Sequence, residues 1–302
     1  MTSRPKTHPI KQSPLHKLGN HRRLAALLKT DLATLGKLAK GGPKLYSEWN
    51  EPKGNGQLRH IENPKPVLKR VQARLAAILA LIEPPDFLTC PVKGRSYVSN
   101  AAFHVGSSEI VTMDVSAYFP STTWKRVYWF FNKRLGMPPD TSWTLASLAT
   151  INGRLPTGSP LSPVLAYLAH EDMWLRVAAL AAEAGCRLTV YMDDITLSGA
   201  RVPEALVWAI RQEIHKTGLR LNQSKHRRFS SGEGVVTGVV VTREGVRLPK
   251  RSHLKLSKAR KDLREAEDKQ TRDALVRRVR GIEAQHRQVM RAMDCSSTRL
   301  QP

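Results

Sequence analysis

The spacing of apolar residues predicts helices and one hairpin in the first third of the chain. Leucines recur at helical spacing over residues 21–39, and a second helical periodicity covers 66–82. Between them, segments 44–51 and 57–61 flank a tip rich in Gly and Pro, a pattern typical of a β-hairpin. Residues 1–19 are polar and basic, and we expect a loose arm there.

The middle of the chain alternates short apolar runs with longer periodic segments. The runs predict strands at 110–115, 186–191 and 195–198, and mostly strand at 219–229 and 235–248. The periodic segments predict helices at 124–135, 142–151, 160–184 and 203–217. This order predicts a sheet with helices packed on one face. From 250 to 291 the pattern becomes helical and basic, with an apolar stripe.

The net charge of the chain indicates what kind of partner it binds. The 302 residues hold 49 Lys and Arg against 25 Asp and Glu, a net charge of +24. Such an excess is too large for an ordinary metabolic enzyme, and it indicates a polyanionic partner, nucleic acid before an anionic membrane. No run of about 18 apolar residues predicts a membrane span, and the N-terminus lacks a signal-peptide pattern. Three cysteines far apart argue against a disulfide framework and favour a reducing cytoplasm.

Three carboxylates stand where strands end. Asp193 and Asp194 occupy the turn between two predicted strands, and Asp114 lies at the end of another. Adjacent carboxylates repel each other, and a divalent cation supplies the opposing charge. Taken singly, the Asp-Asp turn could be a solubilising surface hairpin and Asp114 a turn cap. Together, three such acids can hold two Mg²⁺ ions, the arrangement used for phosphoryl or nucleotidyl transfer.

A third motif opens the predicted helix at 160–184. It reads Leu-Pro-Thr-Gly-Ser-Pro-Leu-Ser-Pro over residues 155–163. The helix N-terminus offers unpaired N–H groups to an anion or a base-paired strand, and the alternative is an ordinary Pro-rich helix start.

The order of these motifs resembles that of reverse transcriptases. Segments 114–119, 155–163 and 191–194 resemble the three palm motifs of that family, and 218–225 resembles the next one. Segment 59–72 resembles the fingers of bacterial members. The resemblance covers about residues 44 to 248 and implies an α+β right-hand polymerase fold, with fingers, a palm of antiparallel sheet and helices, and a helical thumb.

Two shorter signatures resemble those of retron reverse transcriptases. Asn100-Ala-Ala-Phe-His104 resembles their NAxxH motif, and Val236-Thr237-Gly238 resembles their VTG motif. The alternatives are a loop with a packed histidine and an ordinary Val-rich strand. The resemblance implies a basic arm and helix at 1–43, fingers with the NAxxH segment at 44–109, a palm at 110–248 and a basic helical thumb at 249–302. The palm would contain a fingers insertion at about 124–152.

The resemblance also assigns roles around the metal ions. Asp114 and Asp193 would bridge two Mg²⁺ ions, with Mn²⁺ as a substitute, and Asp194 would be a third carboxylate. Candidate contacts to the dNTP substrate are Phe119 beneath the deoxyribose, Thr157, Gly158, Lys225 near the pyrophosphate, and Arg59 and Lys69 at the triphosphate or template. Phe119 could instead be a core aromatic and Lys225 a solvated lysine. Thr157 stands where the family often has Gln, and its side chain has a shorter reach.

The retron signatures are candidates for RNA binding. Asn100, His104, Val236, Thr237 and Gly238 would hold one folded RNA in register, or Asn100 and His104 would fasten their segment against the palm. The implied partners are a cognate noncoding RNA, its branched msDNA product primed from an RNA 2′-hydroxyl, and an effector protein in antiphage defence, with no membrane.

Two other functions remain open. One is another bacterial reverse transcriptase, from a different defence system or group II-like, without a branched product. The other, of a different class, is a non-catalytic scaffold that holds an RNA and an effector protein.

Overall fold

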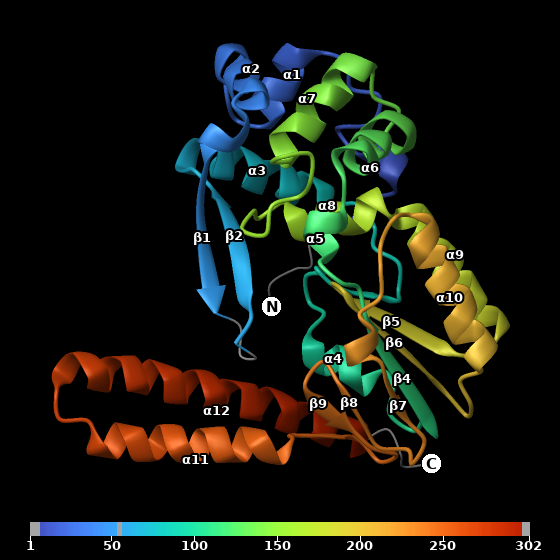
Figure 1. The fold of residues 1–302 in the computed structure, drawn as a ribbon, viewed down its shortest axis with the longest axis vertical. Coiled ribbons are helices and arrows are strands. Elements are labelled where there is room, and N and C mark those ends of the chain that lie inside the picture. Colours follow the sequence, from blue (N-terminus) through green and yellow to red (C-terminus); the bar gives the residue numbers. More distant parts are fainter. Residues whose placement is uncertain (1–6, 53–55, 298–302) are drawn as a thin grey trace.

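A five-stranded sheet forms the centre of the lower part of the molecule in Figure 1. The computed structural model describes residues 7–52 and 56–297. The strands are β3 (Leu88–Cys90), β4 (Glu109–Asp114), β5 (Arg187–Tyr191), β6 (Asp194–Gly199) and β7 (Arg227–Phe229). They lie in the order β3-β5-β6-β4-β7, and only β3 and β5 run parallel. The three predicted central strands are confirmed, whereas β3 was too short to predict.

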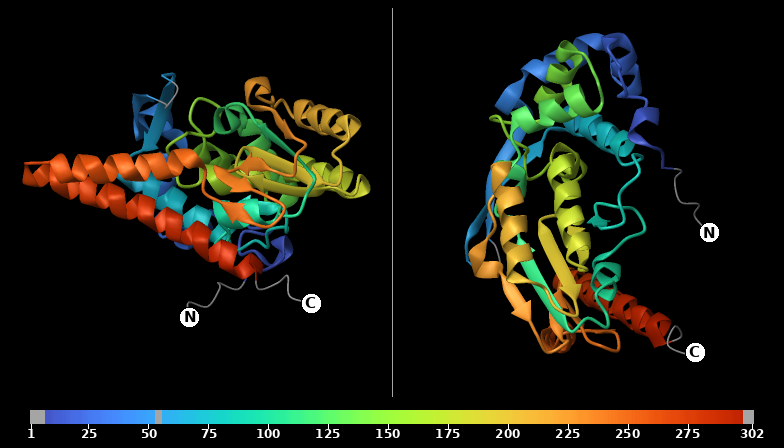
Figure 2. Two further views of the ribbon diagram at one scale, coloured as in Figure 1. Left: turned by 90° about the horizontal axis from the view of Figure 1, so that it is seen from below. Right: turned by 90° about the vertical axis from the view of Figure 1, so that its right-hand side faces the viewer.

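The two faces of this sheet differ in polarity. Alternate residues such as Val111, Met113 and Leu197 are buried in the same apolar cluster as α9 (Glu171–Glu183) and α10 (Glu204–Lys216). Figure 2 shows both helices on one face of the sheet, as predicted. Because the side-chain period is two, the intervening residues, which include Thr112 and Thr196, share the opposite face with Asp114 and Asp194.

The upper lobe of Figure 1 is mainly helical. Its helices are α1 (His21–Leu27), α2 (Leu32–Lys40), α3 (Pro66–Leu79), α6 (Trp124–Trp129), α7 (Pro139–Ala149) and α8 (Ser162–Ala169), with a π-helical turn at Phe130–Arg134. Segment 124–152 lies in this lobe, where α7 contacts α2 and α3. The predicted hairpin is confirmed as β1 (Tyr46–Pro52) and β2 (Leu58–Pro64), and residues 53–55 of its tip lie outside the described residues.

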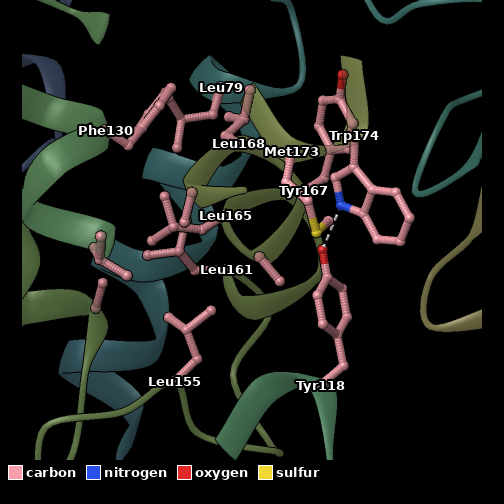
Figure 3. Close-up of a cluster of buried hydrophobic side chains, with 14 of the residues drawn as sticks. Leu79, Tyr118, Phe130, Leu155, Leu161, Leu165, Tyr167, Leu168, Met173 and Trp174 are labelled. Carbon is pink, nitrogen blue, oxygen red and sulfur yellow. Dashed lines mark hydrogen bonds between the residues drawn. The ribbon is translucent and has the colours of Figure 1, made fainter. Parts of the chain in front are cut away.

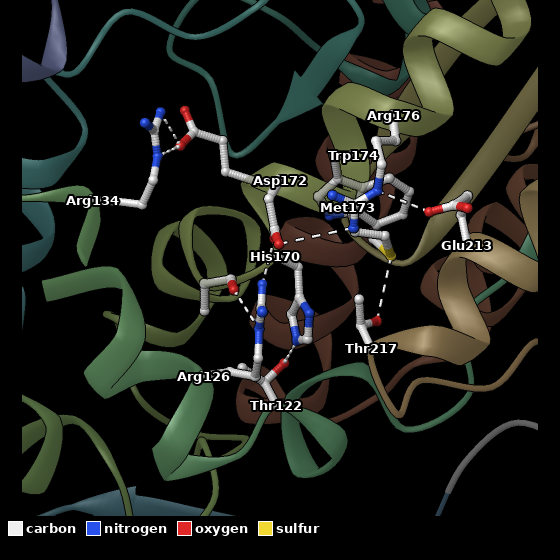
Figure 4. A network of polar contacts seen from close by, with 12 residues as sticks. Thr122, Arg126, Arg134, His170, Asp172, Met173, Trp174, Arg176, Glu213 and Thr217 are labelled. Atoms are coloured by element: carbon white, nitrogen blue, oxygen red, sulfur yellow. Dashed lines mark hydrogen bonds and ion pairs between the residues drawn. The ribbon is translucent and has the colours of Figure 1, made fainter. Parts of the chain in front are cut away.

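Two helices predicted as continuous are each divided. Lys29 has a φ of 55°, and Asp31 caps a new helix by accepting a hydrogen bond from the Thr34 backbone N–H at 2.8 Å. The helix predicted over 160–184 breaks at His170, which is non-helical and buried. At the restart, the acidic residues of the first turn of α9 pair with Arg126 and Arg134, as Figure 4 shows. Hydrophobic periodicity alone does not register either break.

The loose arm predicted at 1–19 is wrong for its described part. Residues 1–6 lie outside the described residues, but Leu15 and Leu18 are buried in the main core. The His8 backbone N–H also donates to the Leu81 carbonyl, and the His8 carbonyl accepts from the Glu83 N–H, so this residue is tied to the segment after α3. Two leucines in a polar stretch give too short a pattern to predict this packing.

The last third of the chain forms a second small sheet and a helical hairpin. Strands β8 (Gly234–Val236), β9 (Val239–Val241) and β10 (Val246–Arg247) are antiparallel. Helices α11 (Lys250–Glu265) and α12 (Lys269–Ser297) lie side by side and extend away from the sheets, as Figure 1 and the left view of Figure 2 show. Strand was expected over most of 219–229, but only β7 forms, because a 3₁₀ turn occupies Gln223–Lys225.

The short helix α4 (Tyr97–Ala102) joins these parts. It contacts β3 and β5 of the large sheet, β8 to β10 of the small sheet, and α12. The boundary predicted at residue 109 therefore separates β3 and α4 from the sheets against which they pack. Within the described ranges, no helix combines the length and apolar content that a membrane span requires.

The main core fixes the segment that follows β4. Tyr118 begins the short helix α5 (Tyr118–Ser121) and is buried, and its hydroxyl accepts a hydrogen bond at 3.0 Å from the Trp174 indole N–H. Figure 3 shows this pair beside the leucines of α8. The backbone just after Asp114 is thus held against α8 and α9.

Candidate active site

The three predicted acids converge at one edge of the polar sheet face. Asp114 ends β4 directly opposite Asp194, the first residue of β6. Asp193 lies in the β5–β6 turn, where Met192 adopts a φ of 60°. The Asp193 carbonyl accepts a hydrogen bond from the Val115 backbone N–H at 2.8 Å, which fastens the turn to the end of β4. The structure therefore brings together carboxylates that are about 80 residues apart in sequence.

The electrostatics of these acids favour a cation. Burial and the negative charge of Asp114 raise the pKa of Asp193. Burial, together with Asp193 and Asp114, raises the pKa of Asp194 to about 6. Lys225 donates to Asp114 Oδ2 at 2.5 Å, and this hydrogen bond raises the pKa of the lysine. The donor set consists of carboxylate oxygens, which suit the hard ion Mg²⁺.

A cavity of about 1010 Å³ opens in front of the acids. Asp114 and Asp194 line it together with Lys225, and Thr237 and Gly238 line it as well. The VTG turn thus faces the same space as two of the three acids. Lys225 lines this cavity, and its role toward pyrophosphate stays a prediction.

Phe119 lies two residues after Ala117, whose φ of 48° turns the chain sharply after β4. Its ring stacks on Tyr118 with centroids 6.0 Å apart, and it is only partly buried. Phe119 therefore packs against the core while keeping an open side, and its contact with a sugar stays a prediction.

Thr157 and Gly158 fasten the β1–β2 hairpin to the segment that precedes α8. The Thr157 hydroxyl donates to the His60 carbonyl at 2.7 Å and accepts from the Glu62 N–H at 3.2 Å. Gly158 N–H donates to the Glu62 carbonyl at 3.2 Å, and a Cβ at Gly158 would lie 2.8 Å from that oxygen. Only glycine allows this approach of two backbones. Because the Thr157 hydroxyl is already hydrogen-bonded to β2, the structure argues against the predicted contact between this hydroxyl and the nucleotide.

Arg59 and Lys69 were predicted contacts to triphosphate or template. Arg59 lies on β2, and its positive charge lowers the pKa of Asp193 against the effect of burial. The ammonium of Lys69 donates to Asn63 Oδ1 at 2.9 Å. The charge of Arg59 thus acts on Asp193, while Lys69 contacts Asn63 at the base of the hairpin.

Asn100 and His104 are both fully buried, which contradicts a direct contact with RNA. His104 Nδ1 lies 2.7 Å from the Ser198 hydroxyl, and its Nε2 lies 2.7 Å from the Thr189 hydroxyl. Burial lowers the pKa of His104 to about 3, so the ring is neutral. These contacts fasten the NAxxH segment to the polar face of the sheet, the second of the two roles considered for it.

The two retron signatures touch each other. Asn100 Nδ2 donates to the Thr237 hydroxyl at 3.4 Å, and that hydroxyl donates to the Tyr97 carbonyl at 2.8 Å. Val236 is buried and Gly238 is exposed. Sequence reasoning missed this contact because the two segments are more than 130 residues apart. The available signal was the run of buried Thr and Ser positions in β5 and β6, which required polar partners.

A further His and Glu cluster lies on the β1–β2 hairpin. Glu48, His60 and Glu62 place ligand atoms within 4.8 Å of one another. His60 pairs with Glu48 at 3.0 Å, and the buried Glu62 pairs with Arg154 at 3.2 Å. Because each of these three side chains already has a partner among its neighbours, we assign no metal to this cluster.

Comparisons with known proteins agree with this geometry. The family model described as reverse transcriptase (RNA-dependent DNA polymerase) matches residues 51–272. The Retron Se72 reverse transcriptase of Salmonella heidelberg is 27% identical over 229 residues, covering 72% of this chain and 60% of that protein. The Retron Mx162 reverse transcriptase of Myxococcus xanthus is 29% identical over 236 residues, covering 68% and 48%. The Retron Ec86 reverse transcriptase of Escherichia coli is 31% identical over 199 residues, covering 63% and 60%.

The chain spans roughly half to three fifths of the length of these curated relatives. Among solved structures, a foamy viral protease-reverse transcriptase in complex with an RNA/DNA hybrid matches 70% of this chain and 24% of its own. The TM-score is 0.41 at 17% identity, which is too distant to support an argument.

Proposed function

This chain belongs to the reverse transcriptase family, and we propose from that premise that it is a retron-type RNA-directed DNA polymerase. The observation that carries the proposal is the convergence of Asp114, Asp193 and Asp194 at one end of the polar sheet face, beside a large cavity. The predicted α+β class of the right-hand polymerases is confirmed by the mixed sheets and helices and by the family match.

Asp114, Asp193 and Asp194 would together hold two Mg²⁺ ions. When bound, such ions lower the pKa of the attacking hydroxyl and neutralise charge on the leaving pyrophosphate. The protein's own residues orient the reactants. Lys225 places a positive charge beside Asp114, and the Thr157 tether holds Arg59 where its charge acts on Asp193. Both cations favour the negative charge of an incoming dNTP.

The basic helical hairpin is the proposed grip on template and primer. Over residues 250–291 there are 14 Lys and Arg against 6 Asp and Glu. In α11 only Ala259 is buried, so the charged side chains of this helix are at least partly exposed to solvent. Phosphate contacts of this kind are independent of sequence and sensitive to salt. An A-form duplex is read by shape and 2′-hydroxyls, which suits a surface of basic helices.

The finer retron chemistry rests on the relatives and on the paired signatures. We propose that the chain works in the bacterial cytoplasm on a cognate noncoding RNA, primes from an RNA 2′-hydroxyl and leaves a branched msDNA. We further propose that it acts in antiphage defence with an effector protein. The contact between Asn100 and Thr237 supports the assignment to the retron type, since it joins the NAxxH and VTG signatures in one structural unit.

Two measurements test the proposal and separate its rivals. The purified protein should extend a DNA primer annealed to an RNA template with Mg²⁺, and EDTA should abolish extension. A non-catalytic scaffold would bind RNA and show no extension. DNA extracted with the protein from its host should be linked to RNA through a 2′–5′ branch. Linear DNA alone would indicate another bacterial reverse transcriptase.

A further inference from the structure

The VTG turn is strained at a residue that ordinarily avoids its conformation. Val236 and Val239 are paired across β8 and β9, so Thr237 and Gly238 form a two-residue hairpin turn. Their φ values are 46° and 83°, both positive. Asn-Gly is the preferred sequence for such a turn, and a β-branched residue at positive φ is a clear outlier. Something outside the turn must therefore hold Thr237 in place.

Hydrogen bonds from α4 provide that restraint. The Thr237 hydroxyl donates to the Tyr97 carbonyl at 2.8 Å and accepts from Asn100 Nδ2 at 3.4 Å. Asn100 is itself fixed, because its Oδ1 accepts from the Thr89 hydroxyl on β3 at 2.7 Å. A chain of polar contacts thus runs from the large sheet through α4 to the turn. Figure 1 shows α4 between the two sheets.

An apolar cluster surrounds these polar contacts and reaches the helical hairpin. It holds Val98 and Ala101 of α4 with Val236 and Val239 of the turn strands, and it includes Val289 of α12. The helix α4 is therefore the joint between the sheet that carries the acids and the basic helices. Hydrophobic packing holds α4, the small sheet and α12 together, whereas the hydrogen bond from the Asn100 amide fixes the orientation of Thr237.

The turn that α4 restrains faces the cavity of the acids. Thr237 and Gly238 line the same 1010 Å³ space as Asp114 and Asp194, and Gly238 is exposed. Asn100 itself is fully buried and cannot touch a nucleic acid there. Any effect of Asn100 on substrate must therefore pass through the turn.

We propose that Asn100 is a positioning residue that holds the strained Thr237–Gly238 turn against the nucleic-acid strand extended at the acids. This inference rests on the proposed polymerase function and adds a role for the NAxxH signature within it. Without the Asn100 hydrogen bond, only the Tyr97 carbonyl restrains the Thr237 hydroxyl, so the turn relaxes toward negative φ at Thr237 and the wall of the cavity moves away from the bound strand. Substrate binding weakens, while the acids remain in place on β4 and β6.

The test compares Asn100→Ala with a control that weakens α4 elsewhere. The control is Ser99→Ala, which removes one half of the capping box at the start of α4 without touching the turn. For an annealed DNA primer on a generic RNA template, Asn100→Ala should raise KM about five- to thirtyfold, the ratio matching the about 1–2 kcal/mol that left-handed geometry costs a residue with a Cβ. The kcat should change far less, and Ser99→Ala should leave KM at the wild-type value.

Two further variants keep the test informative. Thr237→Val removes both hydrogen bonds of the hydroxyl and keeps the strain, so it should raise KM at least as much as Asn100→Ala does, even if the latter fails to fold. Adding Thr237→Gly to Asn100→Ala removes the strain, because glycine adopts positive φ freely, and should lower KM back toward the wild-type value. A merely structural loss in α4 would show no such rescue.

Several outcomes would overturn the inference. One is an unchanged KM in both Asn100→Ala and Thr237→Val. Another is a KM of the double variant that is no lower than that of Asn100→Ala. The third is a rise in KM for Ser99→Ala as large as that for Asn100→Ala. The dissociation constant for the same primer–template, measured by fluorescence anisotropy, gives the same ratios without chemistry. A wild-type protein that binds but does not extend would therefore refute the polymerase proposal while the Kd ratios still decide the role of Asn100.

Discussion

Acidification should destabilise the protein through His104, a neutral histidine buried against the sheet. Burial lowers the pKa of His104 from its ordinary value of 6.5 to about 3, with a smaller contribution from the charge of Arg187. The unfolded chain binds a proton below 6.5, whereas the folded chain does not until about 3. The stability that the neutral ring contributes is therefore complete above pH 6.5 and falls as the pH drops toward 3.

The size of the effect follows from the two pKa values. Each pH unit below 6.5 costs about 1.4 kcal/mol, so at a pH of about 5 the loss from His104 is about 2 kcal/mol relative to a pH of about 7.5. His170, whose pKa burial also lowers to about 3, should add a loss of similar size. Asp194 acts in the opposite sense, because its raised pKa lets the folded state gain a proton over the same range.

A difference measurement isolates the histidine. Urea unfolding of the wild type and of His104→Gln is followed at a pH of about 7.5 and at a pH of about 5. Glutamine keeps a donor and an acceptor for Ser198 and Thr189 but does not titrate. The wild type should lose about 2 kcal/mol more than the variant between the two pH values, and the Asp194 contribution cancels. Equal losses would mean that His104 is not held neutral against the sheet.

Three further perturbations have defined outcomes. Thr157→Val removes two hydrogen bonds to β2, each worth about 0.5–1.5 kcal/mol, and should raise KM for dNTP and speed amide exchange at Glu62. Thr157→Ser keeps the hydroxyl and should lose much less, and equal losses in the two variants would mean that the hydroxyl alone does not hold β2. Phe119→Ala should admit ribonucleotides into the product, and an unchanged deoxy preference in an active variant would make Phe119 a core residue. Neutralising basic residues over 250–291 should lower the log–log salt slope of RNA binding by about 0.7 to 0.9 for each phosphate interaction removed, whereas an unchanged slope would leave this charge as a solvated face.

The acids could be predicted from the sequence because the residues on either side of each acid show where strands end and turn. Asp114 ends an apolar run, and Asp193 and Asp194 separate two others, so strand ends and a turn follow from the pattern of residues alone. Their convergence required only that neighbouring antiparallel strands pair in register, which the structure shows at Asp114 and Asp194. The hairpin with Arg59 was predictable for the same reason.

The remaining features depend on contacts between distant segments. Thr157 is a tether only because β2 passes within hydrogen-bonding distance, and no local pattern contains that information. Asn100 and His104 look like binding residues in sequence, since both are polar and close together, yet the large sheet buries them. The break at His170 is invisible for a similar reason: apolar periodicity continues through it, and the arginines that fix the restart come from another segment.

The central claim is that three carboxylates on one sheet edge drive metal-dependent DNA synthesis, and Asp193→Asn tests it most directly. The change removes one negative charge at a turn and almost no packing volume. Single-nucleotide extension of a primer on RNA with Mg²⁺ should fall to background, while RNA affinity stays near the wild-type value. Asp86→Asn, at an exposed acid that does not line the cavity of the acids, is the matched control and should extend normally. Near-normal extension by Asp193→Asn would contradict the assignment of the acids.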